Sequence, residues 1–587
     1  GNDIVFDAST FPSSSNQKDR NKLILSLINL FDNNKIEWND DLPIVLDKNN
    51  NFQFEEDRED DIKTLKSRDM LRLNKYATAE DCMNALTEKY QLEAYSKSDA
   101  RKIASVCYEM RANSFNTANP YTFAADVDEK IASVIMENSN VYKGVKVQVS
   151  TYREYTDGTI APHILGTTGQ IDAEEYRDLK KDGYAMDDII GKSGIESEFE
   201  KNLKGTNGTK IVSTATDGSQ TVESKELKNG DNIILTIDSK LQKVAQDSLA
   251  ETCKSFSTKN AGGGAVVVMN CNTGEILAIA SYPSYNLSTY KDDYKKLAAD
   301  TKHIPLFNRA LQSTYSPGST AKVSTALACL EEKIITENTT KVCTGNYEYL
   351  GHTFKCQIEH DDSDLNVKTA LQDSCNTFFF YYGGEKLGVE KLNMYREILG
   401  LGQKTGVELY ESAGILDSPS YRTSIGQTWQ PGYSLLSAIG EAGNQFTPIQ
   451  LCNYAATIAN GGTRYKAHLI KSILSSDNSK VILNKEPEVI HQAGFSQINL
   501  NIVKAGMRLV VTNGTCNEVL GQLSVPVACK TGTSEVQYYD KGKTTTYTNG
   551  FNISFAPYDK PEIAVAVAIE GGTSGAGVAP VARAVYN

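Results

Sequence analysis

The chain has 587 residues and a formal net charge of −13 at pH 7, with 40% hydrophobic and 23% charged residues. It is too long for a single hydrophobic core, so we expect two or three domains. The acidic balance argues against binding to nucleic acid or to an anionic lipid surface, and the longest apolar segment near the start, LILSLINLF, is too short to span a bilayer.

Residues 1–255 are predicted to form an N-terminal module with two parts. Residues 1–140 are polar and contain four amphipathic segments that predict helices, namely NKLILSLINLF, DIKTLKSRDMLRLN, AEDCMNALTEKY and DARKIASVCYEM. Residues 141–255 have a mixed pattern of short strands and glycine-rich turns. This second part ends in a predicted helix, DSKLQKVAQDSLAETC, with Asp238 or Ser239 as its N-cap.

Residues 256–587 are predicted to form a second domain, of the α+β class. GGGAVVVMN and EILAIASYP flank the turn CNTG and predict a β-hairpin. Helical segments are expected from Ser319, Lys368 and Ser434, and three more strands are expected in VPVACKTGT, NGFNISFAPYD and EIAVAVAIEGG. The order of hairpin, helices and strands predicts a largely antiparallel sheet with helices packed against it.

The segment YSPGSTAKVSTALACLEE places a serine and a lysine at the start of a predicted helix. Ser319 and Lys322 are three residues apart, so they lie on one face of that helix. A serine hydroxyl needs a base beside it to act as a nucleophile, and a lysine can serve if burial or nearby positive charge lowers its pKa. Because S-x-x-K occurs by chance in many helices, this pair alone defines no function.

Two later segments carry motifs that accompany S-x-x-K in known enzymes. QDSCNTFFF carries Ser374 and Asn376, and ACKTGTSE carries Lys530 at the start of K-T-G. The order S-x-x-K, S-x-N, K-T-G is the signature of penicillin-binding proteins and class A β-lactamases. We therefore expect Ser319 to be the nucleophile, Lys322 its base and Lys530 the source of a positive field that keeps Lys322 uncharged. Ser374 can carry a proton to the leaving amine, and Asn376 can hold Lys322 and the substrate amide.

The K-T-G strand is expected to bind the free carboxylate of the substrate. Lys530 can attract this carboxylate, and the hydroxyl groups of Thr531 and Thr533 can donate hydrogen bonds to it. Gly532 has no side chain, so the substrate backbone can approach closely. The backbone N–H groups of Ser319 and Thr533 are predicted to form the oxyanion hole.

Beyond these motifs the chain resembles the class B penicillin-binding proteins, closest to the penicillin-binding protein 2 type, over roughly residues 140–587. The resemblance is carried by several phrases: APHILGTTG, IIGKSGIESEFEKNLKGTNG, NIILTIDSKLQ, NTGEILAIASYPSYN, NRALQSTYSPGSTAK, AIGEAGNQFTPIQL, IANGGT and FAPYDKPEIAVAVAIEGG. It implies the penicillin-binding transpeptidase fold, with a helical subdomain and an elongated N-terminal pedestal module. GKSGIE is similar to the signature of that module, and no glycosyltransferase domain is recognisable ahead of it, which favours class B over class A.

The resemblance also implies an activity and its partners. Such proteins are D,D-transpeptidases of the cell wall: they cross-link peptidoglycan stem peptides, contribute to cell shape and are acylated by β-lactam antibiotics. They act at the extracytoplasmic face of the membrane, with an N-terminal membrane helix that we expect to precede this sequence. They work with a polytopic membrane glycosyltransferase. Cysteines that stay unpaired in an extracytoplasmic protein are typical of an anaerobic source. Cysteine pairs like Cys343 and Cys356 also occur in this part of related Gram-positive proteins.

Four positions depart from the family pattern. Ala321 stands where Phe is frequent in the first motif, and Cys529 precedes the K-T-G lysine where Gly is common. In IGEAGN, Glu441 and Ala442 replace the more usual Gln-Gly. These changes affect the predicted shape of the cleft and leave the catalytic groups in place.

A metal site is predicted in CTGNYEYLGHTFKCQIEH, together with the cysteine of the S-x-N motif. Thiolates and imidazoles at these spacings are ligands of tetrahedral zinc. We favour Cys356, His360 and Cys375 as ligands, with Cys343 as the fourth. An acid such as Asp361 or Asp373 is the alternative to Cys343. A Cys343–Cys356 disulfide, or free thiols with His352 and His360 on the surface, are the other interpretations.

Two other functions share some of these features. A β-lactamase or β-lactam sensor has the same three motifs, but the long N-terminal module disfavours it. A non-catalytic scaffold is disfavoured because the residues of all three motifs are intact. Mass analysis after exposure to penicillin distinguishes the three functions.

Overall fold

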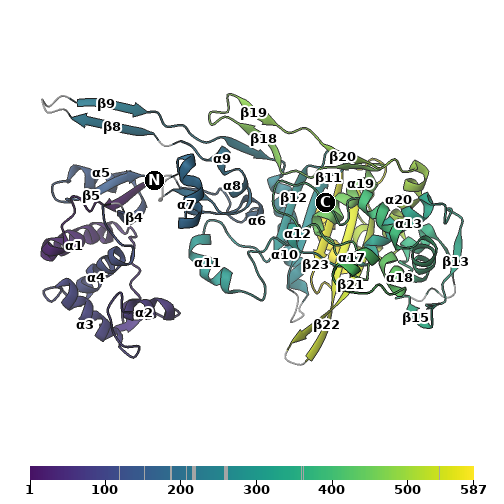
Figure 1. The fold of residues 1–587 in the computed structure, drawn as a ribbon, viewed down its shortest axis with the longest axis horizontal. Coiled ribbons are helices and arrows are strands. Elements are labelled where there is room, and N and C mark those ends of the chain that lie inside the picture. The colour runs from purple at the N-terminus through teal and green to yellow at the C-terminus, as the bar shows by residue number, and fades with distance from the viewer. Residues whose placement is uncertain are drawn as a thin grey trace. The chain divides into compact units, whose positions relative to one another are not determined.

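The computed structural model describes all residues except 118, 151, 185–187, 207, 215–219, 257–261, 358–359, 361–362 and 541–542. The chain divides into two compact units, Gly1–Glu154 and Tyr155–Asn587. Each unit has its own strands, helices and hydrophobic core (Figure 1). None of the helices in the described part of the chain has both the length and the hydropathy of a membrane-spanning segment.

The first unit packs helices against a small antiparallel sheet. β1 (Asn2–Phe6) is the central strand of this sheet, between β4 (Tyr121–Val127) and β5 (Val145–Val149). The other elements are η1 (Ser14–Asn16), α1 (Gln17–Asn34), β2 (Ile44–Leu46), β3 (Phe52–Phe54), α2 (Glu59–Lys66), α3 (Ala79–Tyr90), α4 (Lys97–Ala112) and α5 (Glu129–Glu137). Three of the predicted amphipathic segments lie in α1, α3 and α4. The fourth segment, DIKTLKSRDMLRLN, is helical only to Lys66, because the backbone becomes extended at Ser67.

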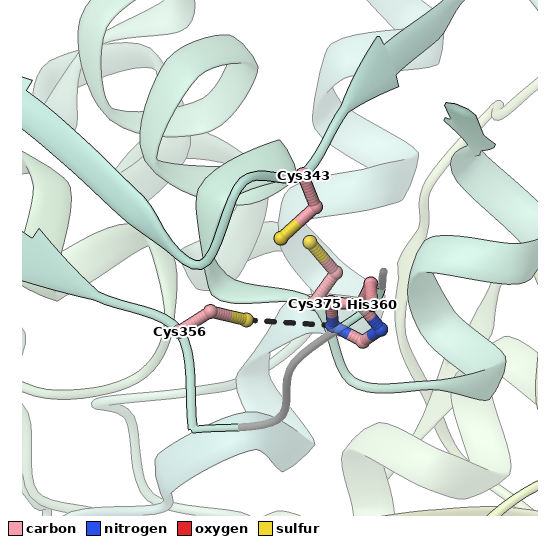
Figure 2. Close-up of side chains that lie close together, drawn as sticks. All are labelled: Cys343, Cys356, His360 and Cys375. Atoms are coloured by element: carbon pink, nitrogen blue, oxygen red, sulfur yellow. Dashed lines mark hydrogen bonds between the residues drawn. The ribbon is translucent and has the colours of Figure 1, made fainter. Parts of the chain in front are cut away.

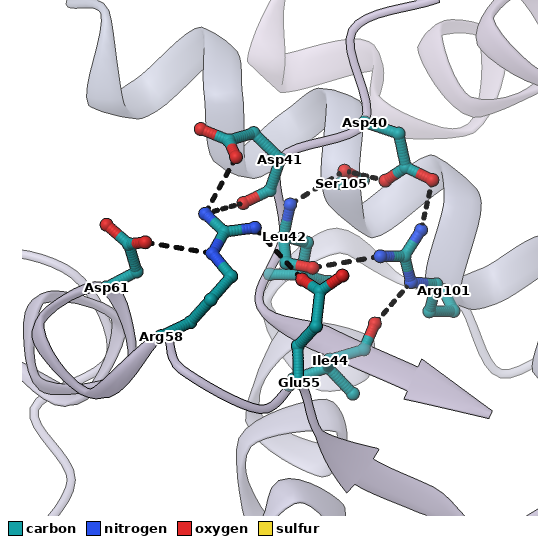
Figure 3. A network of polar contacts seen from close by, with 9 residues as sticks. All are labelled: Asp40, Asp41, Leu42, Ile44, Glu55, Arg58, Asp61, Arg101 and Ser105. Carbon is teal, nitrogen blue, oxygen red and sulfur yellow. Dashed lines mark hydrogen bonds and ion pairs between the residues drawn. The ribbon is translucent and has the colours of Figure 1, made fainter. Parts of the chain in front are cut away.

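A network of ion pairs and hydrogen bonds fixes the loop before β2 (Figure 3). Arg101 of α4 donates hydrogen bonds to the carbonyl oxygens of Ile44 at 2.6 Å and Leu42 at 2.9 Å, and it forms an ion pair with Asp40. Arg58 lies among three carboxylates, those of Asp41, Glu55 and Asp61. These carboxylates raise the pKa of Arg58 above its usual value despite partial burial. Arg58 and Arg101 are thus neutralised by acids.

The second unit begins with short elements and one long helix. These are α6 (Pro162–Leu165), β6 (Thr168–Gln170), α7 (Ala173–Leu179), η2 (Lys180–Asp182), β7 (Ile189–Gly191), α8 (Gly194–Glu198), α9 (Glu200–Leu203), β8 (Thr209–Thr214), β9 (Gln220–Lys225), β10 (Asn232–Leu235) and α10 (Ser239–Ser255). Asp238 caps α10 as predicted, because its carboxylate accepts hydrogen bonds from the N–H groups of Lys240 and Leu241. The predicted domain boundary after residue 255 stays a prediction.

The core of the second unit is a five-stranded antiparallel sheet in the order β12-β11-β23-β22-β21. Its strands are β11 (Gly264–Asn270), β12 (Ile276–Tyr282), β21 (Ala528–Asp540), β22 (Lys543–Ala556) and β23 (Ile563–Ile569). On β11, Val266 and Val268 pack with α10 and α22 (Gly575–Tyr586), whereas Val267 and Met269 pack with α19 (Pro448–Ala459). Because both faces of the sheet are covered there, β11 and β23 are apolar along nearly their whole length. The predicted α+β class is confirmed, and the K-T-G strand β21 lies at the sheet edge.

The remaining helices and short strands of the second unit carry two of the three motifs. They are α11 (Tyr290–Ala299), α12 (Arg309–Gln312), η3 (Gly318–Ala321), α13 (Lys322–Glu331), β13 (Thr340–Val342), β14 (Asn346–Tyr349), β15 (His352–Lys355), β16 (Asp364–Asn366), α14 (Val367–Gln372), α15 (Asn376–Phe379), η4 (Phe380–Leu387), α16 (Val389–Ile398), α17 (Pro419–Ser424), α18 (Gly432–Ala438), β17 (Thr463–Tyr465), β18 (Ile470–Leu474), β19 (Val481–Asn484), β20 (Val489–Gln492), α20 (Gln497–Thr512) and α21 (Asn517–Leu520). From Lys322 to Leu330 every residue of α13 is buried. A helix that is buried all round lies in the core, so Lys322 is held rigidly.

Candidate active site

The S-x-x-K segment is a tight turn at the start of a buried helix. Ser319 lies in the 3₁₀ turn η3, and Lys322 is the first residue of α13, so the α-helix begins three residues later than expected. Gly318 has a φ of +53°, and a Cβ atom on it would lie only 2.2 Å from the carbonyl oxygen of Thr533. The glycine therefore lets this turn pass directly against β21. Ser319 itself remains partly exposed.

Lys322 is completely buried and is held by the S-x-N motif. Its Nζ donates hydrogen bonds to Asn376 Oδ1 at 2.5 Å, to the Ser374 carbonyl oxygen at 2.7 Å and to Ser374 Oγ at 3.3 Å. Burial, and next the charge of Lys530, lowers the pKa of Lys322 to about 7. A large fraction of this lysine is therefore uncharged at neutral pH, which a base requires.

Ser374 lies between the two lysines of the site. Lys530 Nζ donates hydrogen bonds to Ser374 Oγ at 3.0 Å and to the Thr531 carbonyl oxygen at 2.9 Å. Ser374 Oγ is therefore within reach of both amines. Ser374 has a φ of +53°, a backbone conformation that is uncommon for residues other than glycine and is enriched at functional sites. Burial lowers the pKa of Lys530 to about 8.

The K-T-G strand runs close to the nucleophile turn. A Cβ atom on Gly532 would lie 2.6 Å from the Pro317 carbonyl oxygen and 3.1 Å from the Thr320 backbone nitrogen, so glycine is required here for close packing. Thr531 Oγ1 lies 2.9 Å from Thr515 Oγ1, and Thr533 is partly exposed. The structure thus brings the residues of all three motifs together in one site.

Comparisons with known proteins agree with this geometry. A family model described as "Penicillin binding protein transpeptidase domain" matches residues 264–587, and one described as "Penicillin-binding Protein dimerisation domain" matches residues 1–235. The "Peptidoglycan D,D-transpeptidase MrdA" of Acinetobacter baumannii is 30% identical over 472 residues, which cover 76% of this chain and 67% of that protein. The chain belongs to the class B penicillin-binding proteins of the PBP2 type. It is a peptidoglycan D,D-transpeptidase and a target of β-lactams.

Solved structures support the same conclusion. The structure described as "Complex between Penicillin-Binding Protein (PBP2) and MreC from Helicobacter pylori" is similar with a TM-score of 0.69 and 25% identity, covering 87% of this chain and 92% of that one. The structure described as "Structural coordination of polymerization and crosslinking by a peptidoglycan synthase complex" gives a TM-score of 0.68 and 29% identity, covering 80% and 81%. The penicillin-binding transpeptidase fold with an N-terminal dimerisation or pedestal domain is therefore confirmed.

This penicillin-binding protein also has a cluster of potential metal ligands beside the S-x-N motif (Figure 2). The ligand atoms of Cys343, Cys356, His360 and Cys375 all lie within 4.8 Å of one another, so the group could hold a metal ion. Cys356 Sγ lies 3.4 Å from His360 Nε2 and accepts a hydrogen bond from the Asn376 N–H at 3.2 Å. The cluster therefore contacts the residue that holds Lys322.

The alternatives for this cluster can be compared with the structure. None of the cysteines, all of which lie in the described part of the chain, is in a disulfide, so the Cys343–Cys356 disulfide that the spacing also allowed is not formed. His352 is exposed on β15 and does not join the cluster, and neither does Asp373. Asp361 lies outside the described residues. Three thiols and one imidazole are a donor set that suits a tetrahedral ion such as zinc.

Sequence reasoning missed residues that border the penicillin-binding site. The ring of Phe379 lies under the Lys322 ammonium, with 5.8 Å between Nζ and the ring centroid. Thr515 contacts the hydroxyl group of Thr531. Glu535 follows Thr533 by two residues on β21 and affects the pKa of Glu441. Only Glu535 had a sequence signal, since alternate residues of a strand point to the same side.

Proposed function

We propose that this chain cross-links stem peptides through an acyl-enzyme on Ser319, with Lys322 as its base. Uncharged Lys322 takes the hydroxyl proton while Ser319 Oγ forms a bond to the carbonyl carbon of the penultimate D-alanine. The C–N bond to the terminal D-alanine then breaks, and Ser374 relays the proton from Lys322 to the leaving amine. The observation that carries this proposal is the position of Ser374 Oγ, at 3.3 Å from Lys322 Nζ and 3.0 Å from Lys530 Nζ.

The other predicted residues act on the substrate in this proposal. Lys530, Thr531 and Thr533 bind the terminal carboxylate, which is favoured by the positive charge at this end of the cleft. The N–H groups of Ser319 and Thr533 stabilise the oxyanion. Gly532 has no side chain, so the substrate backbone can approach β21 closely. β-Lactams acylate the same serine and are released slowly.

The acyl group is then transferred to an amine of a neighbouring strand. Lys322 removes a proton from the attacking nitrogen and returns it to Ser319 Oγ as the C–O bond breaks. Asn376 Oδ1 keeps Lys322 Nζ in place during both steps, since it accepts a hydrogen bond from that amine at 2.5 Å. The same residues thus serve both half-reactions.

We also propose that the Cys343–Cys356–His360–Cys375 cluster binds zinc in a structural role. Cys375 is the N-cap residue of α15, whose first residue is Asn376, and the Cys356 thiol accepts a hydrogen bond from the Asn376 N–H. A metal ion at this cluster would supply four bonds that restrain the S-x-N loop. These residues hold Asn376 and Ser374 in the positions that Lys322 requires.

The cellular setting follows from the substrate. Stem peptides are outside the cytoplasm, so we place the enzyme at the extracytoplasmic face of the cell membrane, together with a polytopic glycosyltransferase. The relatives support this partner, since one solved complex concerns both polymerization and crosslinking and another contains MreC. We propose residues 1–255 as the pedestal module and residues 256–587 as the transpeptidase domain.

Intact-mass analysis after exposure to benzylpenicillin tests the role of Ser319. We expect a stable adduct of one penicilloyl group that maps to Ser319 and is absent from Ser319→Ala. Rapid loss of the adduct with continuous hydrolysis of the drug would instead indicate a β-lactamase. The absence of any adduct on the folded wild-type protein would contradict the proposal and favour a scaffold.

A further inference from the structure

The turn after α18 carries an acid, Glu441, where the family pattern has Gln. The carbonyl oxygen of the preceding residue, Gly440, accepts hydrogen bonds from the Gly318 N–H at 3.3 Å and from Ser316 Oγ at 2.9 Å. Gly440 has a φ of +84°, and a Cβ atom on it would lie 2.1 Å from the Gly318 carbonyl oxygen. The backbone next to Glu441 is therefore fixed against the segment that carries Ser319.

The carboxylate of Glu441 is half-buried and has no hydrogen bond or ion pair with any described residue. Two titratable groups interact with it electrostatically, Lys322 from α13 and Glu535 from β21. Burial, and next the charge of Glu535, raises the pKa of Glu441 to about 7. A half-buried carboxylate without a protein partner among the described residues is available to a ligand.

Glu535 lies on the other side of the nucleophile segment. Gly318 binds the Gly440 carbonyl oxygen through its N–H and packs against the Thr533 carbonyl oxygen. Glu535 is exposed two residues beyond Thr533 on the same strand, so the side chains of these two residues point to one side of the sheet. Glu441 and Glu535 thus flank the turn that carries Ser319.

The surroundings of Ser319 therefore have a cationic part and an acidic part. Lys530 suits the free carboxylate of the donor stem peptide, and this leaves the acids for the second substrate. That substrate is an amine, which is an ammonium ion in water at neutral pH. We propose that Glu441, assisted by Glu535, binds the ammonium group of the acceptor strand and positions it at acyl-Ser319. This inference deepens the proposed function and rests on it.

The proton balance gives Glu441 a defined role. The acceptor ammonium loses one proton to the Glu441 carboxylate and becomes an amine. The amine nitrogen forms a C–N bond to the acyl carbon, Lys322 takes a second proton from that nitrogen, and the C–O bond to Ser319 breaks as Lys322 returns this proton to Oγ. Glu441 then releases its proton to water. The acylation half-reaction involves no acceptor amine, so only the second half-reaction needs Glu441.

Partition of the acyl-enzyme between water and amines tests this inference. A thioester analogue of the acyl-D-Ala-D-Ala donor would be given to the full chain at neutral pH with one of two acceptors. D-Alaninamide is cationic under these conditions, and hydroxylamine is uncharged. Glu441→Gln restores the family residue, Glu535→Gln removes the second charge, and Glu390→Gln, at an exposed position on α16, is the matched control.

We expect Glu441→Gln to lower the ratio of aminolysis to hydrolysis about ten-fold for D-alaninamide, with less than about two-fold change for hydroxylamine. Glu535→Gln should lower the D-alaninamide ratio about three-fold, and Glu390→Gln should not change it.

Equal losses for both acceptors, or no loss in either the Glu441 or the Glu535 variant, would overturn the role of Glu441. If Glu441→Gln does not fold, an unchanged ratio in Glu535→Gln overturns it. A wild-type protein without an adduct on Ser319 would instead overturn the proposed function.

Discussion

Two sets of buried or half-buried cations in this protein have opposite surroundings. In the first unit, Arg58 and Arg101 are matched by carboxylates (Figure 3), and the pKa of Arg58 is raised. In the active site, Lys322 and Lys530 form no ion pair with any described residue, and burial lowers their pKa to about 7 and about 8. Acids in ion pairs with a cation stabilise its charge, whereas burial without an ion pair favours loss of its proton.

The arginines of the first unit therefore have a structural role, whereas the active-site lysines have a chemical role. Arginine remains charged in proteins, so it suits the network that ties α4 to the loop before β2. Lysine changes its protonation state readily when it is buried, and the second unit holds such a lysine next to a serine. Hydroxyl, amide and carbonyl oxygens are the partners of the active-site lysines, which orient the amines without adding negative charge.

Removal of the active-site base should have the largest effect on acylation of the variants that test this comparison. Lys322→Gln keeps a polar group of similar length but cannot accept the proton of Ser319. We expect the second-order rate constant for acylation by benzylpenicillin to fall at least about 1000-fold. Lys333→Gln, at an exposed position after α13, is the control and should acylate like the wild type. A fall of less than about ten-fold would show that another group is the base.

Loss of the metal cluster should have a smaller effect on the same lysine, through the S-x-N loop. Cys356→Ser removes one thiol ligand and weakens the contact with the Asn376 N–H. We expect zinc, measured by elemental analysis of the purified protein, to fall from about one ion per chain to near zero, and acylation to slow about ten-fold. Cys107→Ala, in the first unit, should keep the metal. A metal-free wild type with normal acylation would contradict the zinc proposal.

Removal of a structural cation should lower the stability of the first unit and leave acylation unchanged. Arg101→Met removes the hydrogen bonds to Ile44 and Leu42 and leaves Asp40 without its ion pair. We expect a loss of about 2–4 kcal/mol in local stability, seen as faster hydrogen exchange in peptides from α4. Acylation of Ser319 should be unchanged. Slower acylation in this variant, with unchanged exchange in α4, would contradict the separation of the two roles.

Loss of the positive charge of Lys530 should shift the pKa of the base without removing the base. Lys530→Gln removes a positive charge beside Lys322, so the pKa of Lys322 should rise and its uncharged form should appear only at higher pH. The pH at which acylation is half-maximal should therefore move upward, in addition to weaker binding of the drug carboxylate. A midpoint that moves to lower pH would contradict the electrostatic coupling of the two lysines.

The sequence predicted the residues of the site better than their arrangement in space. Ser319, Lys322, Ser374, Asn376 and Lys530 were identified because each motif is short and local. All four residues of the metal cluster were among the favoured ligands for the same reason. The position of Ser374 Oγ between two amines was not predictable, because it depends on the packing of three segments far apart in the chain.

Long-range contacts also explain what the sequence did not indicate elsewhere. The departure at Glu441 was visible, but its relation to Glu535 depends on how the turn after α18 meets β21. Similarly, the partners of Arg101 are carbonyl oxygens about sixty residues away, which carry no residue-type signal. In contrast, the apolar strands β11 and β23 and the cap at Asp238 were predictable, since periodicity and capping are local properties.

The pH dependence of acylation by benzylpenicillin tests the central claim most directly, namely that buried Lys322 is uncharged near neutral pH and acts as the base. The rate constant should rise with pH, because deprotonation creates the base, and should level off with a midpoint at about 7. Glu441→Gln should keep this rising limb, which assigns it to Lys322 rather than to the Glu441 carboxyl. A rate constant that continues to rise to about pH 10, as for an ordinary lysine, or that does not depend on pH, would contradict the account.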